Sequence, residues 1–241
     1  MPALFISDLH LSPERPDITR AFLVFLQHRA AQASALYILG DLFETWIGDD
    51  DPAELSVEIQ GALRNLTDAG VPLFVQAGNR DFLLGPGFAR ATGATILADQ
   101  HIITHYGHRA LIMHGDSLCT DDLAYQRFRR YARNPLLQFC FKRLSLVRRQ
   151  KLAADMRRKS AAANSNKASE IMDVNGEAVA GIMEKHRVIT LIHGHTHRPN
   201  RHQVASGERI VLGDWHSLGW VLSLDDAGYD LQSFSIATAE Q

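Results

Sequence analysis

The sequence contains few cysteines, no long apolar run and no segment with the composition of a flexible linker. Cys119 and Cys140 are its only cysteines, too few for a disulfide framework. No uninterrupted apolar run approaches the roughly 18 residues that a membrane-spanning helix needs. The first residues, MPALFISDLH, lack the basic and then apolar layout of a secretory signal. We therefore expect a cytoplasmic protein that does not cross a membrane, although these absences do not exclude attachment to a membrane surface.

The composition is that of a globular protein with one large core. Of the 241 residues, 46% are hydrophobic and 22% are charged, which excludes a disordered or fibrous chain. Hydrophobic cores stop growing only above roughly 250 residues, and no Gly/Ser-rich or Pro-rich linker divides this chain. We therefore expect a single domain, residues 1–241, rather than two equal domains.

The formal net charge of -2 hides an uneven distribution. Between Tyr125 and Ser160, twelve Lys and Arg residues stand against one acid, Asp155, so this segment carries +11 and the rest of the chain -13. An acidic body with a basic segment predicts an anionic partner, which could be a nucleic acid, a membrane surface or a phosphorylated substrate.

Short apolar runs alternate with amphipathic stretches along the first hundred residues, and this βαβαβ order is typical of parallel strands. Strands are expected at 3–7, 35–39, 71–76, 101–105, 109–113 and 188–192, with strands and turns over 201–236, and helices at 17–30 and 54–69. Residues 121–186 are instead helical and basic, with a break at Asn134-Pro135. We interpret 121–186 as a helical insertion.

Five polar motifs follow the predicted strands. They are Asp8-Leu9-His10, Gly40-Asp41, Gly78-Asn79-Arg80-Asp81, His114-Gly115-Asp116 and Gly194-His195-Thr196-His197. In an α/β sheet the ligand site lies outside the carboxyl ends of the strands, so these motifs are expected to converge. Each motif alone is ordinary turn or cap chemistry. Five in order, each at a strand end, favour a functional site.

The candidate ligands among the side chains of these motifs are two carboxylates, one amide and four imidazoles, namely Asp8, Asp41, Asn79, His10, His114, His195 and His197. Seven oxygen and nitrogen ligands are too many for one transition metal and suit two divalent ions that share a bridging carboxylate. The members of the pairs Asp8/His10 and His195/His197 are two residues apart, a spacing that in a strand aims both side chains to one side.

Three further groups have the same residue types but fit the pattern less well. Asp214 and His216 are expected to line the site or to orient ligating histidines. His193 is expected to be a buried residue at a strand end. The acidic run 49–51 is expected to be a solvated turn rather than a third metal site.

The five motifs in this order resemble the calcineurin-like metallophosphoesterase superfamily. The resemblance spans Asp8 to His197 and implies a four-layered α/β/β/α sandwich with two metal ions. One ion would be held by Asp8, His10, Asp41 and His197, and the other by Asp41, Asn79, His114 and His195, so that Asp41 bridges them. The expected fold class is therefore this α/β sandwich with a helical basic insertion.

Two positions depart from the usual pattern of the superfamily. Arg80 stands where a histidine commonly assists the leaving group, and Glu44 stands where Gly-Asp-x-x-Asp is usual. Arginine is not a general acid at neutral pH, but its planar donors suit a phosphate. A leaving group of low basicity, such as a phosphate, needs no proton donor. Asp41, Asn79, Arg80 and His195 are the expected catalytic residues.

Gly48-Asp49-Asp50-Asp51 and Cys119-Thr120-Asp121-Asp122 extend the resemblance to the branch that hydrolyses a UDP-linked diacyl sugar in the lipid A pathway. This resemblance implies two Mn²⁺ ions and an activated water that attacks the α phosphorus. It implies substrate contacts at Asn79, Arg80, Asp122, Ser160, Asn164, Lys167 and His195. It also implies peripheral association with the cytoplasmic face of the inner membrane. We expect no nucleic acid, because the insertion has few aromatic residues arranged for base stacking, and no obligate protein partner.

The basic insertion fits such a substrate, because apolar residues around Phe139 and Leu146 alternate with cations, as at a lipid interface. The same apolar residues could instead pack the insertion onto the body. Three other functions stay open: a nucleic-acid phosphodiesterase, a nucleotide or protein phosphatase, and a membrane-binding protein with structural metals.

Overall fold

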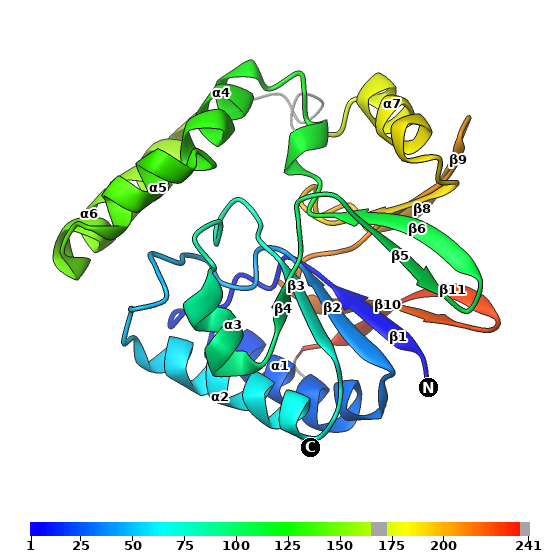
Figure 1. The fold of residues 1–241 in the computed structure, drawn as a ribbon, viewed down its shortest axis with the longest axis horizontal. Coiled ribbons are helices and arrows are strands. Elements are labelled where there is room, and N and C mark those ends of the chain that lie inside the picture. Colours follow the sequence, from blue (N-terminus) through cyan, green and yellow to red (C-terminus); the bar gives the residue numbers. More distant parts are fainter. Residues whose placement is uncertain (165–172, 237–241) are drawn as a thin grey trace.

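Two β-sheets lie face to face, and helices cover their outer faces (Figure 1). The computed structural model describes residues 1–164 and 173–236. The first sheet has the order β11-β10-β1-β2-β3-β4 and the second β5-β6-β7-β9-β8. The predicted four-layered α/β/β/α architecture is thereby confirmed.

The first sheet is parallel from β1 to β4 and ends in an antiparallel hairpin. Its strands are β1 (Ala3–Ile6), β2 (Ala35–Leu39), β3 (Leu73–Gln76), β4 (Thr95–Ile96), β10 (Leu218–Asp225) and β11 (Gly228–Ser235). Every residue of β1 and β2 is buried, as expected for central strands covered on both faces.

The second sheet is parallel along β6, β7 and β9 and antiparallel at both edges. Its strands are β5 (His101–His105), β6 (His108–Met113), β7 (Thr190–His193), β8 (Asn200–Val204) and β9 (Gly207–Val211). The parallel strands β1 to β3 and β6 to β7 carry the five polar motifs at their carboxyl ends.

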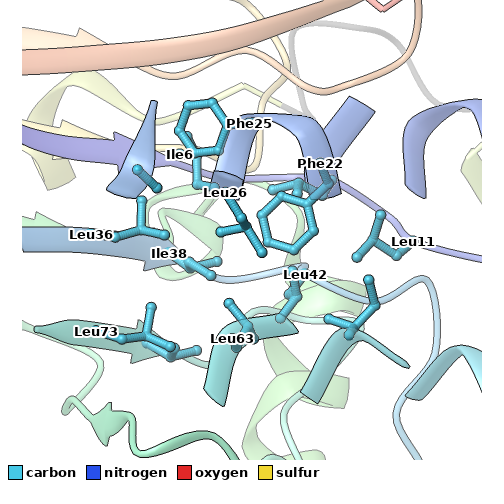
Figure 2. Packing of buried hydrophobic residues seen from close by; sticks show 14 of the residues in the cluster. Ile6, Leu11, Phe22, Phe25, Leu26, Leu36, Ile38, Leu42, Leu63 and Leu73 are labelled. Carbon is cyan, nitrogen blue, oxygen red and sulfur yellow. The ribbon is translucent and has the colours of Figure 1, made fainter. Parts of the chain in front are cut away.

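Apolar side chains fill the three spaces between the four layers. The helices on the first sheet are α1 (Pro16–His28), α2 (Glu54–Asp68) and α3 (Pro86–Thr92), and two short 3-10 helices lie at Ala30–Gln32 and Asp116–Leu118. Figure 2 shows Phe22, Phe25 and Leu26 of α1 against Ile6, Leu36 and Ile38 of the sheet. On the second sheet, α7 (Gly176–His186) buries Val179 and Met183.

Helices α4 (Leu123–Ala132), α5 (Pro135–Lys142) and α6 (Leu146–Asn164) form one elongated group in Figure 1, separate from the helices on the first sheet. Neither α4 nor α5 contains a buried residue. The break falls at Asn134-Pro135, where the Asn134 side chain accepts hydrogen bonds from the amides of Leu136 and Leu137. The limits 121–186 of the insertion stay a prediction.

Among the described residues, no helix combines the length and the apolar character that spanning a membrane requires.

Candidate metal centre

The polar motifs that end five parallel strands meet at one edge of the sandwich. Asp8 and His10 follow β1, Asp41 follows β2 and Asn79 follows β3. From the second sheet, His114 follows β6, and His195 and His197 follow β7. Backbone hydrogen bonds join these loops: the amide of Asp8 donates to Gly40, and that of Gly194 donates to His114. Seven residues that span positions 8 to 197 of the chain therefore share one site.

Asp8, His10 and His197 form the first group whose atoms could hold a metal ion. The Nε2 atoms of His10 and His197 lie 3.3 Å apart, and His197 Nε2 lies 3.4 Å from Oδ1 of Asp8. Unprotonated imidazole nitrogens gathered this closely around a carboxylate oxygen are suited to a shared cation.

Asp8, Asp41 and His114 form the second group. His114 Nε2 lies 3.0 Å from Oδ1 of Asn79 and 3.7 Å from Oδ2 of Asp41. The ring of His195 lies next to that of His114, with centroids 5.0 Å apart. The same Oδ2 of Asp41 lies 3.9 Å from Nε2 of His10, so this one oxygen faces both groups.

The backbone at these positions is left-handed. Asp8, His10, Asp41, His195 and His197 have φ between 51° and 69°. The expectation that a strand period of two aims the paired side chains is wrong, because β1 ends at Ile6 and β7 ends at His193. A left-handed residue costs of order 1–3 kcal/mol, and such strain persists where surrounding structure enforces it, as at functional sites. Sharp turns, rather than extended strands, present these ligands.

The two carboxylate oxygens of Asp8 have different surroundings. Oδ2 accepts hydrogen bonds from Ser7 Oγ at 2.6 Å and from the amide of His195 at 2.8 Å. Oδ1 is buried and accepts no hydrogen bond from any residue that the structure describes. A buried carboxylate oxygen needs a partner. A cation beside His10 and His197 would supply one, so the residues present fit a divalent metal.

The charge states of Asp8 and His195 are those that metals bind. Burial opposes ionisation of Asp8, but the contact with His197 and the nearby His114 hold the pKa of its carboxyl well below the usual range. Burial, together with His114, lowers the pKa of His195 to about 4, so its imidazole is neutral at pH 7. Ionised carboxylates and neutral imidazoles are the forms that metals bind. Burial lowers the pKa of His10, His114 and His197, but contacts with nearby carboxylates outweigh it and raise these pKa values, that of His197 to about 9, so a metal ion would displace a proton from His197.

Asp81 fixes the loops that carry Asp41 and Asn79, a role that sequence reasoning missed. Its buried carboxylate accepts hydrogen bonds from the amides of Gly78 at 2.7 Å, Leu42 at 2.8 Å and Asp41 at 3.3 Å. Asp41 in turn accepts one at 2.8 Å from the amide of Arg80. The loops after β2 and β3 are therefore tied through one side chain. Its place beside Asn79 and Arg80 was the only signal in the sequence.

Helix α4 is also tied to the site. Asp116, two residues beyond His114, accepts hydrogen bonds from Tyr125 Oη at 2.6 Å and Arg129 Nε at 2.8 Å. The Tyr125 ring stacks on His195, with centroids 5.9 Å apart. Arg133 donates to the carbonyls of Ala77 and Gly78, next to Asn79. The first helix of the basic segment thus contacts the loops after β3, β6 and β7.

Apart from Asn79 and His195, which lie in the cluster, the predicted substrate contacts are Arg80, beside the cluster, and four residues on the basic helices or next to them in the sequence. The Arg80 side chain lies beside the cluster, 3.1 Å from Glu44. Asp122 is the N-cap of α4, where it accepts a hydrogen bond from the amide of Tyr125. Ser160 lies on α6 and is exposed. Asn164 ends α6, and its side chain lies outside the described residues, as does Lys167.

The residues that fitted the ligand pattern less well lie in different parts of the structure. His193 ends β7 and is fully buried, as expected. Asp214 Oδ2 lies 3.6 Å from Nδ1 of His197. The expectation of a solvated turn at 49–51 is wrong for Asp49, because its carboxylate accepts hydrogen bonds from the amides of Gly85 and Gly87 at the start of α3.

Comparison with known proteins gives a family match over most of the chain. A family profile described as calcineurin-like phosphoesterase matches residues 1–199. The chain is 51% identical over 241 residues to a UDP-2,3-diacylglucosamine hydrolase of Pseudomonas fluorescens, covering 98% of this chain and 96% of that protein. It is 53% identical over 238 residues to the enzyme of the same name from an Enterobacter species, covering 97% and 99%.

A solved structure supports the fold alone. An archaeal phosphodiesterase with 12% sequence identity superimposes with a TM-score of 0.51, covering 97% of this chain and all of that one.

Gly78→Ala is expected to weaken metal binding and to destabilise the protein by about 1–3 kcal/mol, because the added Cβ would overlap the Asp41 carboxylate and amide. The matched control is Gly61→Ala within α2, where no atom lies within 4 Å of the added Cβ. Removing a helical glycine there is expected to stabilise the protein by about 0.5–1 kcal/mol. Urea unfolding and Mn²⁺ titration test both variants. Unchanged Mn²⁺ affinity in Gly78→Ala would contradict the assigned position of Asp41.

Proposed function

This chain belongs to the calcineurin-like phosphoesterase family, and we propose that it is a UDP-2,3-diacylglucosamine hydrolase of lipid A biosynthesis. It cleaves the pyrophosphate bond of UDP-2,3-diacylglucosamine to give 2,3-diacylglucosamine 1-phosphate and UMP. The observation that carries the proposal is the cluster around Oδ2 of Asp41, which faces His10 and His114 at one edge of the sandwich. Relatives that match nearly the whole chain at about half identity support this choice of substrate.

In this proposal the ligand set divides into two groups around Asp41. Asp8, His10, Asp41 and His197 hold one divalent ion, and Asp41, Asn79, His114 and His195 hold the other. The position of Asp41 Oδ2 between His10 and His114 supports a shared Asp41, while Asp8 lies close enough to the ligand atoms of both groups to belong to either. We propose Mn²⁺ for both ions because the resemblance to the lipid A branch of the family implies it; the three oxygen and four imidazole ligands do not by themselves select one divalent metal. When bound, the ions lower the pKa of water and offset the charge of the diphosphate.

The chain's own residues orient the diphosphate and stabilise its charge. Water attacks the α phosphorus in line, the bond from that phosphorus to the bridging oxygen breaks, and its electron pair leaves with the lipid-bearing phosphate. Arg80 donates to the diphosphate oxygens through its planar guanidinium and supplies no proton. Asn79 and His195 contact the reacting phosphate. Asp122, Ser160, Asn164 and Lys167 contact the rest of the substrate, an assignment that follows the resemblance to the relatives.

We propose further that helices α4 to α6 lie against an anionic membrane at the cytoplasmic face of the inner membrane. Large apolar side chains are exposed along them, among them Leu123, Tyr131, Leu136, Phe139 and Val147. Of the twelve cations of this segment, Arg129, Arg133, Arg149 and Arg157 bind the body of the protein. The other eight are exposed, as an anionic lipid surface requires.

The experiment that tests the activity is removal of metal with a chelator, return of Mn²⁺, and measurement of the products from UDP-2,3-diacylglucosamine. We expect hydrolysis to UMP and the lipid monophosphate only after Mn²⁺ is returned. In ¹⁸O-labelled water the label is expected in UMP, because the α phosphorus is attacked. Label in the lipid phosphate would contradict the attack at the α phosphorus.

Single-stranded DNA, single-stranded RNA and a simple phosphodiester serve as parallel substrates. Cleavage of one of these with the lipid substrate left intact would overturn the lipid assignment and leave a metal-dependent phosphodiesterase.

Arg80→Ala is expected to lower kcat by about 10²-fold while two Mn²⁺ ions stay bound, since the lost guanidinium stabilises charge in the transition state. Steady-state kinetics and Mn²⁺ titration measure the two quantities separately. Asp41→Ala is the comparison variant, because removal of the shared carboxylate is expected to abolish both turnover and Mn²⁺ binding. Loss of both ions in Arg80→Ala would contradict its assigned role.

Membrane association is tested by sedimentation with vesicles of phosphatidylglycerol and phosphatidylcholine. Arg148→Gln combined with Lys151→Gln removes two exposed cations of α6. Each is worth roughly 1 kcal/mol near an anionic surface, so we expect roughly 30-fold weaker binding. Arg90→Gln combined with Lys185→Gln removes the same charge from α3 and α7 and is expected to change binding little. If both double variants lose vesicle binding equally, a specific membrane-binding face on helices α4 to α6 is contradicted.

A further inference from the structure

Glu44 lies between the imidazole of His10 and the guanidinium groups of Arg80 and Arg157, and it is not one of the predicted ligands. It belongs to the segment between β2 and α2, three residues after Asp41. Its Oε2 lies 3.0 Å from Nδ1 of His10. Its Oε1 lies 3.1 Å from Nη1 of Arg80 and 3.6 Å from Nη1 of Arg157. A single carboxylate thus contacts a proposed metal ligand, a proposed phosphate-binding group and helix α6.

The contact with His10 is on the side of the ring away from the ligand cluster. His10 directs Nε2 towards His197 and Asp41, and its Nδ1 faces Glu44 in an ion pair whose angle lies outside that of a hydrogen bond. A carboxylate at that nitrogen keeps the proton on Nδ1, leaves the lone pair on Nε2 and fixes the plane of the ring. In the same cluster His114 is held through Nδ1 by the carbonyl of Leu39 at 2.8 Å.

The contact with Arg80 restricts a long, flexible side chain. The backbone amide of Arg80 is already fixed by Asp41 Oδ1 at 2.8 Å. With Nη1 held by Glu44, both ends of the residue are anchored, which lowers the entropy lost when the guanidinium engages an anion.

The contact with Arg157 reaches Glu44 from a distant part of the chain. Besides the ion pair, Arg157 Nη2 donates to the carbonyl of Glu44, and Arg157 Nε donates to Thr45 Oγ1 at 3.1 Å. Helix α6 therefore contacts the body of the protein at the residue that also holds His10 and Arg80.

We propose that Glu44 is a positioning residue that couples the docking of helix α6 to the orientation of His10 and Arg80. The inference rests on the proposed metal-dependent function, since it gives His10 the role of a metal ligand. It predicts that loss of the Glu44 charge weakens metal binding even though Glu44 touches no metal.

The first test is equilibrium binding of Mn²⁺, followed by the electron paramagnetic resonance signal of the free ion. Glu44→Gln removes the charge at nearly constant size, and one of its two Mn²⁺ ions is expected to bind about tenfold more weakly than in the wild type. Glu44→Asp keeps the charge and is expected to recover most of that loss. Wild-type affinity for both ions in Glu44→Gln would overturn the proposal.

Asp50→Asn is the matched control. Asp50 also joins α6 to the segment after β2, through Arg149 at 2.7 Å, but it is not paired with a proposed metal ligand. Its Mn²⁺ affinity is expected to stay within twofold of the wild type. An equal loss in Asp50→Asn would assign the effect to α6 docking in general and would overturn the role of Glu44.

A double-mutant cycle tests the coupling to α6. Arg157→Gln is expected to weaken Mn²⁺ binding in the wild-type background and to have a smaller effect when Glu44 is already Gln. If the changes in Mn²⁺ binding free energy caused by Glu44→Gln and Arg157→Gln are fully additive in the double variant, the coupling is contradicted.

Wild-type protein that binds two Mn²⁺ ions without hydrolysing UDP-2,3-diacylglucosamine would overturn the proposed function only, since the binding data still decide the role of Glu44. Wild-type protein that binds no Mn²⁺ would overturn both.

Discussion

The site depends on holding one carboxylate, that of Asp41, between two groups of proposed ligands, each of which draws residues from both sheets. One of its oxygens is fixed by the amide of Arg80, and the other faces His10 and His114. Asp81 fixes the backbone on both sides of this arrangement. Carboxylates and imidazoles this close and this buried are costly unless each polar atom has a partner. The tight turns at the strand ends follow from that requirement, because extended backbone would carry the ligands away from Asp41.

The sequence predicted the layers and the positions of the five polar motifs better than it predicted the backbone conformation of those motifs. Buried parallel strands appear as short apolar runs, so β1, β2 and β3 could be located from hydrophobicity alone. The proposed ligands could be found because they follow those runs directly. The left-handed backbone of Asp8 and Asp41 could not be predicted, since a positive φ is uncommon for every residue other than Gly, even for Asp and His, which are enriched there.

Residues that act through partners far along the chain were also beyond sequence reasoning. Asp116 meets Arg129 in α4, and Glu44 meets Arg157 in α6, at separations that no local pattern encodes. The same limit applies to the basic segment. Its charge predicted an anionic partner, but part of that charge neutralises acids of the protein itself, such as Asp50 and Asp99. Only a structure separates the cations that hold the helices in place from those left exposed.

The pairing of β1 with β10 has a consequence for the order of events during synthesis. Ala3 lies opposite Leu224, and Asp8 accepts a hydrogen bond from the amide of His195. Strand β1 and Asp8 therefore depend on partners that are synthesised 221 and 187 residues later in the chain. Chains emerge from the ribosome at about 5–20 residues per second, so the edge of β1 that pairs with β10 stays unpaired for roughly 10–40 seconds, although β2, on its other edge, is made early. During that interval β1 exposes an unpaired edge, and no complete metal centre exists to capture an ion.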